Sequence, residues 1–158
     1  MLMKLRGSKG FTIIELLIVI AVIAILVGIA LPRFKGMRDE GNIARAKGEL
    51  RTLQSAVESY RIHTGTYPAT GATWQTALTG ATPQIVSAAM NDPFAAAGTQ
   101  YVLVLSSGTG GNFYAIYSVG PAANGAVSAV SDTTGAVTET NGTSCIYVGN
   151  GSTPDTQP

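Results

Sequence analysis

The sequence Gly10-Phe11-Thr12-Ile13-Ile14-Glu15 opens an apolar run that continues to Leu31. Only Thr12 and Glu15 carry polar side chains among the 21 residues from 11 to 31. At a helical rise of about 1.5 Å per residue, the run spans about 30 Å, which matches the hydrocarbon core of a bilayer. A short basic leader precedes it, with Lys4, Arg6 and Lys9. The sequence therefore predicts a membrane-length helix that begins close to the N-terminus.

Glu15 is the only carboxylate in this run. An isolated carboxylate in lipid costs roughly 3 kcal/mol, and such residues usually mark function. In one interpretation, Glu15 lies near the membrane interface and reaches water. In the other, a cut after Gly10 frees an amine on Phe11, and this amine meets Glu15 of a parallel chain displaced along the helix axis. Each charge then neutralises the other where neither tolerates isolation, and assembly becomes directional.

The stretch Lys9-Gly10-Phe11-Thr12-Ile13-Ile14-Glu15-Leu16-Leu17 resembles the processing motif of type IV prepilins and of type II secretion pseudopilins. The resemblance covers residues 4 to about 35 and continues more weakly to about 125. It implies that a prepilin peptidase cleaves between Gly10 and Phe11 and methylates the new N-terminal Phe11. It also implies that Glu15 serves filament assembly, with an inner-membrane assembly platform and minor pseudopilins or pilins as partners. The leader is then cytoplasmic and the C-terminal domain periplasmic, before the chain enters a periplasmic or extracellular filament.

A signal anchor that tethers an enzyme or a binding module is the alternative from another class of function. An anchor explains the apolar run, but it explains neither the Gly10–Phe11 junction nor Glu15. The chain has one His and one Cys, and it has no phosphate-binding loop and no carboxylates paired at a catalytic spacing. We therefore expect a structural subunit that is not an enzyme.

Charge is distributed unevenly along the chain. All ten Lys and Arg residues lie at or before Arg61, and the only acidic residues after it are Asp92, Asp132, Glu139 and Asp155. A basic surface for nucleic acid would have to lie on the helical part, where acidic residues are interleaved, so nucleic-acid binding is not expected. With 158 residues, the chain has room for one globular domain beyond the helix.

Gly28 and Pro32 lie four residues apart near the end of the apolar run. Because proline cannot donate to the carbonyl four residues back, we expect a kink or a locally melted turn between them. The related filaments lose helical structure in this region. Beyond it, residues 33–63 form an amphipathic helix half whose apolar stripe should pack on the globular domain. The stripe consists of Ile43, Ala46, Leu50, Leu53, Val57 and Tyr60.

The rest of the chain predicts an α+β fold, in which a small antiparallel sheet packs against the long helix. We expect short helices at 74–78 and 84–90, strands at 101–105, 113–119, 126–130 and 145–148, and hairpin turns at 106–111 and 132–135. Trp74 is expected in the core, His63 as a helix-end cap, and Cys145 as a small buried residue. The expected segments are a leader 1–10, a membrane or filament-core helix 11–32, the amphipathic half 33–63, a globular domain 64–148 and a flexible tail 149–158.

Within the pilin-like family, the order of features is most similar to that of the major pseudopilins, known as pseudopilin G. The similar stretches are Arg51–Tyr60, Gly65–Pro68, Asp92–Phe94 and Tyr117–Gly120. Those proteins bind calcium in the loop that follows, but residues 121–125 contain no carboxylate here. Asp132 with Asn124 is a weak candidate site, because calcium takes about six to eight oxygen ligands; we expect no metal.

We therefore predict the major pseudopilin of a type II secretion system, with a major or minor pilin of a type IV pilus as the alternative. The single Cys, which excludes an internal disulfide, favours the pseudopilin.

Overall fold

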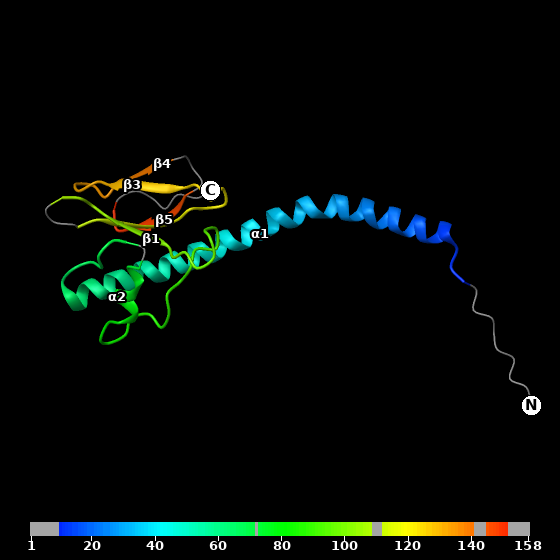
Figure 1. The fold of residues 1–158 in the computed structure, drawn as a ribbon. Coiled ribbons are helices and arrows are strands. Elements are labelled where there is room, and N and C mark those ends of the chain that lie inside the picture. The colour runs from blue at the N-terminus through cyan, green and yellow to red at the C-terminus, as the bar shows by residue number, and fades with distance from the viewer. Residues whose placement is uncertain (1–9, 72, 109–111, 141–144, 152–158) are drawn as a thin grey trace, which may run out of the picture. The chain divides into compact units, whose positions relative to one another are not determined.

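The computed structural model describes residues 10–71, 73–108, 112–140 and 145–151 (Figure 1). The chain divides into two compact units, residues 1–38 and 39–158. One helix, α1 (Ile13–Thr64), begins in the first unit and ends in the second. The second unit adds a short helix and five strands to its half of α1, so the predicted α+β class is confirmed.

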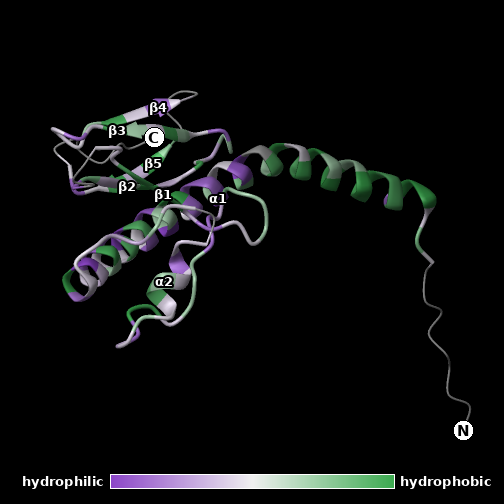
Figure 2. Cartoon of the chain, turned by 60° about the vertical axis from the view of Figure 1, so that its left-hand side comes forward, coloured by the Kyte–Doolittle hydropathy of each residue, from purple (hydrophilic) through white to green (hydrophobic). Residues whose placement is uncertain are grey.

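The described part of the first unit is an apolar helix without a core of its own. Its large apolar side chains up to Leu31 are exposed, from 46% at Val27 to 82% at Phe11. Its most apolar 18-residue window has a mean hydropathy of 3.2, so α1 is long and apolar enough to cross a membrane. Figure 2 colours this part of α1 mostly as hydrophobic, whereas the half in the second unit alternates between hydrophobic and hydrophilic residues.

The segment around Gly28 and Pro32 is helical in the single chain, since α1 is assigned without a break from residue 13 to residue 64. Of the two alternatives predicted for these residues, a locally melted turn is therefore not found here, and a kink stays a prediction. Proline removes one donor, and the bonds of the flanking turns are sufficient to keep the helix. Melting of this segment in a filament stays a prediction.

The second unit has three layers, which Figure 1 shows as α1, a three-stranded sheet and a two-stranded sheet. The apolar stripe of α1 is buried as predicted: Ala46, Leu50, Leu53 and Val57 are fully inaccessible. Ile43 and Tyr60 are partly buried at the two ends of this stripe. The stripe faces one side of the three-stranded sheet.

The three-stranded sheet has the order β1-β2-β5 and is antiparallel throughout. Its strands are β1 (Val102–Leu105), β2 (Tyr114–Ser118) and β5 (Ile146–Gly149). Alternate residues face opposite layers, as the strand period of two requires. In β2, Tyr114 and Ile116 pack with the α1 stripe, whereas Ala115 and Tyr117 pack with the second sheet.

The second sheet pairs β3 (Ala126–Val130) with β4 (Val137–Thr140) through the predicted turn at Asp132. The sequence pattern predicts one sheet and gives no prediction of β4. This strand has a single large apolar residue, Val137, and none of its residues is fully buried, so its pattern carries little strand signal.

The predicted helix at 84–90 is wrong. The helix before it, α2 (Gln75–Thr79), matches the one predicted near Trp74. The segment 84–90 instead runs as irregular backbone, because its polar groups find other partners. Gln75 donates from Nε2 to Met90 O at 2.9 Å and accepts from Met90 N at 2.7 Å, and thereby pairs with this backbone as a neighbouring strand would.

The predicted tail also begins too early. Gly149 belongs to β5, and Gln54 of α1 donates to its carbonyl at 2.8 Å. The Asn150 side chain accepts from Tyr114 N at 2.9 Å and donates to Tyr67 Oη and Asn112 O. Residues 149–151 are therefore part of the folded unit, and the rest of the predicted tail, 152–158, lies outside the described residues.

Candidate functional site

The N-terminal candidate site consists of Gly10, Phe11, Thr12 and Glu15. Gly10 and Phe11 are exposed and precede the first residue of α1, so the bond between them lies in accessible backbone outside the helix. A protease can reach such a bond without first unwinding a helix. The leader residues 1–9 lie outside the described residues.

Thr12 and Glu15 cap the start of α1 reciprocally. Glu15 Oε2 accepts from Thr12 N at 2.9 Å and from Thr12 Oγ1 at 2.8 Å. In return, Glu15 N donates to Thr12 Oγ1 at 3.2 Å, and Leu16 N donates to Thr12 O at 3.3 Å. This is the capping-box arrangement, which satisfies donors that a helix start leaves without partners. Thr12 keeps its backbone N–H after a cut before Phe11, so the arrangement is compatible with that cut.

Both hydrogen bonds from Thr12 go to Oε2 of Glu15, so within the described residues Oε1 is left to accept from a further donor. The carboxylate is also fixed at the head of the helix, within about one turn of Phe11. Thr12 was not among the predicted site residues, although a Thr followed three residues later by a Glu before an apolar run is a recognised helix-start signal.

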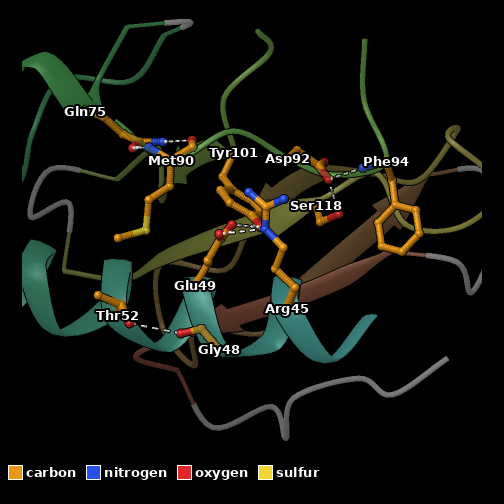
Figure 3. Close-up of polar contacts among 10 residues, drawn as sticks. All are labelled: Arg45, Gly48, Glu49, Thr52, Gln75, Met90, Asp92, Phe94, Tyr101 and Ser118. Carbon is orange, nitrogen blue, oxygen red and sulfur yellow. Dashed lines mark hydrogen bonds and ion pairs between the residues drawn. The ribbon is translucent and has the colours of Figure 1, made fainter. Parts of the chain in front are cut away.

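The globular unit is attached to its half of α1 by a partly buried polar network (Figure 3). Glu49 on α1 accepts from Tyr101 Oη at 2.6 Å and from Arg45 Nε at 2.8 Å. Tyr101 is 1% exposed, and burial, followed by the bond to Glu49, raises the pKa of its phenol well above the ordinary value. The phenol therefore remains a neutral donor to the carboxylate. Trp74 Nε1 donates to the backbone oxygen of the same Tyr101 at 2.7 Å, so the expectation of a core tryptophan is confirmed.

A second network closes the end of α1. Arg61 donates to the Tyr67 hydroxyl, and its guanidinium lies 4.4 Å from the centre of the Tyr67 ring. Tyr67 in turn packs against Tyr114 with ring centres 4.9 Å apart. His63, predicted as a helix-end cap, lies in the last turn, where its Nδ1 is 2.8 Å from Ser59 O. Cys145 is fully buried as predicted, and burial raises the pKa of its thiol to about 12.

The weak calcium candidate is not assembled by the fold. Asn124 precedes β3 and Asp132 follows it, so the two lie at opposite ends of a strand that is about 17 Å long. Calcium ligands must lie within about 2.6 Å of one ion, which two such residues cannot satisfy together. Asp132 Oδ1 instead accepts from Gly108 N at 2.7 Å. Among the described residues, no three His, Cys, Asp or Glu side chains gather at one point.

Known proteins match two parts of the chain. A family model of the prokaryotic N-terminal methylation motif matches residues 5–31, and that of type II secretion system protein G matches residues 33–133. The type II secretion system core protein G of Pseudomonas aeruginosa is 29% identical over 68 residues, which are 43% of this chain and 48% of that protein.

Pilus proteins match a shorter region. A fimbrial protein of P. aeruginosa is 42% identical over 55 residues, or 35% of this chain and 36% of that protein. The fimbrial protein EcpB of Eikenella corrodens is 49% identical over 58 residues, or 37% and 36%. These matches span about half the length of the curated relatives or less, and no solved structure matches significantly. The protein G family model nevertheless covers well over half of the sequence, and the chain belongs to the type II secretion system protein G family.

Proposed function

We propose that this chain is the major structural subunit of a type II secretion pseudopilus, a helical homopolymer that assembles from the inner membrane and supports protein export. The observation that carries the proposal is the Thr12–Glu15 cap, which follows the exposed Gly10–Phe11 junction and heads an apolar helix with no cover of its own. A helix of this kind must be covered by lipid or by copies of itself.

The proposal places the steps in the following order. Before assembly, the apolar half of α1 lies in the inner membrane and the second unit lies in the periplasm. A prepilin peptidase removes residues 1–10 and methylates Phe11, which leaves a cationic amine next to Thr12. The amine then meets the Glu15 carboxylate of another copy, which removes two isolated charges from an apolar environment. As copies are added at an inner-membrane assembly platform, helices of neighbouring copies replace the lipid around α1.

Processing is tested by mass spectrometry of the membrane protein, which should lack residues 1–10 and carry a methyl group on Phe11. Assembly is tested by Glu15→Ala. This variant should be processed and found in the membrane, but it should give few filaments, because the amine of the next copy has no counter-charge. Normal filament yield from Glu15→Ala would remove Glu15 from the mechanism. The control is Ser55→Ala, which changes an exposed residue of α1 far along the chain from the junction.

A pilus subunit is the second candidate, and the pilus relatives with 42% and 49% identity over 55 and 58 residues favour it. The match over residues 33–133 to protein G favours the pseudopilus. Deletion of the gene separates the two functions. Loss of protein export with unchanged surface pili supports the pseudopilus, whereas loss of surface pili with normal export supports the pilus.

A further inference from the structure

The loop that joins β2 to β3, residues 119–125, uses its own backbone to close. Gly125 N donates to Val119 O at 3.0 Å, and Ala123 N donates to Gly120 O at 2.8 Å. These two carbonyl oxygens face N–H groups of the same loop. They are therefore already engaged, whereas a cation in the loop would require carbonyl oxygens that point to a common centre.

A buried carboxylate from another segment holds the start of this loop. Asp92 is 5% exposed and lies before β1, far from the loop in sequence. Its Oδ1 accepts from Ser118 Oγ at 2.8 Å and from Phe94 N at 2.9 Å, and its Oδ2 accepts from Val119 N at 2.9 Å. Figure 3 shows the carboxylate between Phe94 and Ser118. Three donors stabilise the buried charge without a cation.

Ser118 extends this contact into the loop. Its side chain is fully buried, and its Oγ accepts from Gly120 N at 3.2 Å while it donates to Asp92. The chain of bonds thus runs from Asp92 through Ser118 to the first turn of the loop. The carboxylate of Asp92 and the hydroxyl of Ser118 thus both have partners, as buried polar groups require.

The end of the loop is fixed by close packing. A Cβ atom on Gly125 would lie 2.8 Å from Val119 O and 2.9 Å from the Cα of Cys145, which directly precedes β5. The backbone at Gly125 therefore touches both the start of the loop and the neighbouring strand. Little space is left for an ion and its shell of oxygens at this end.

We propose that the contacts of the buried Asp92 carboxylate with Ser118 and Val119, together with the bonds within the loop and the packing at Gly125, are sufficient to fix the β2–β3 loop without a divalent cation, so that the subunit folds independently of calcium. The loop position is the one at which the related major pseudopilins bind calcium. In this chain residues 121–125 contain no carboxylate, and the loop is held by protein contacts alone among the described residues. The inference concerns folding of the second unit, and it holds for a pseudopilus or a pilus subunit alike.

The test measures thermal unfolding of the full chain in detergent, with about 10 mM calcium chloride or with a chelator; this concentration exceeds the dissociation constant of about 10⁻³ M of the weakest calcium modules. The midpoint temperatures with calcium and with the chelator should agree within about 1 °C, because a ligand that does not bind the native state does not stabilise it. An increase of several degrees with calcium would overturn the proposal.

Two variants test the role of Asp92 itself. Asp92→Asn should lower the midpoint by several degrees in both conditions, because one oxygen that accepts hydrogen bonds becomes an NH₂ group that faces donors. Asp132→Asn makes the same change on an exposed turn; it is the matched control and should lower the midpoint temperature less. If Asp92→Asn does not fold, Ser118→Ala gives the milder test, with a smaller decrease that calcium does not reverse. The proposal would be overturned if neither variant lowered the midpoint. It would also be overturned if calcium restored the midpoint of a variant to that of the unchanged protein.

Discussion

Substitution of Tyr101 by Phe removes the hydroxyl that joins the globular unit to α1. The ring remains in the core, so the change isolates the bond of 2.6 Å from Tyr101 Oη to Glu49. A hydrogen bond to a charged group is worth about 1.5 to 3 kcal/mol. Because the Glu49 side chain is 24% exposed and keeps its contact with Arg45, water and Arg45 can replace part of this contribution. We therefore expect a loss of about 1 to 2 kcal/mol in the free energy of unfolding.

Trp74 provides the signal for this measurement. It is the only tryptophan, it is 3% exposed, and its Nε1 bonds to the backbone of Tyr101 itself. Unfolding in urea, followed by Trp74 fluorescence in detergent, should give a lower midpoint for Tyr101→Phe with an unchanged slope. The matched control is Tyr147→Phe, since Tyr147 is 4% exposed and its hydroxyl has no bonding partner among the described residues. Equal effects of the two variants would refute the assignment of the stabilisation to the Glu49 bond.

Three further outcomes follow from the second unit. Gly149→Ala should destabilise the fold by about 1 to 3 kcal/mol in urea unfolding, because the new Cβ would lie 2.5 Å from Tyr114 O. Gly48→Ala, whose new Cβ would meet no atom within 4 Å, should stabilise α1 by about 0.5 to 1 kcal/mol. A Gly149→Ala protein more stable than the Gly48→Ala protein would contradict the packing. Asn150→Ala should lower stability by about 1 to 3 kcal/mol, because Tyr114 N loses its acceptor; a neutral result would return residue 150 to the flexible tail. The free energy of unfolding should fall as the pH rises from 9 towards 12, because the Cys145 thiol loses its proton near pH 9 in the unfolded chain and keeps it to about pH 12 in the folded chain. Urea unfolding of Cys145→Ala should show a smaller fall over the same pH range. An equal fall would exclude this thiol as the cause.

The helical part of the structure could be predicted because its signals are local and periodic. The spacing from Ile43 to Tyr60 identified the buried stripe, and the apolar run to Leu31 identified the half without a core. The β2 and β5 strands were found because β-branched and aromatic residues are concentrated there. The β4 strand was missed because its only large apolar residue is Val137.

The remaining errors concern side chains that bond to distant backbone. Gln75 takes the polar groups of Met90 that a helix would have used, and Asn150 holds a segment that reads as a tail. Asp92 lies 26 residues before Ser118 in sequence, and no local pattern links them. Such partners become visible only when the chain is folded. In contrast, the pair of Thr12 and Glu15 is local, and its spacing alone would have indicated the cap.

The contact between Phe11 and Glu15 of different copies is the central claim, and a structure of the assembled filament tests it most directly. The account predicts the methylated Phe11 amine of one copy within about 4 Å of the Glu15 carboxylate of another, enclosed by apolar helices. A filament in which Glu15 faces bulk water, with no amine of another copy near it, would contradict the account.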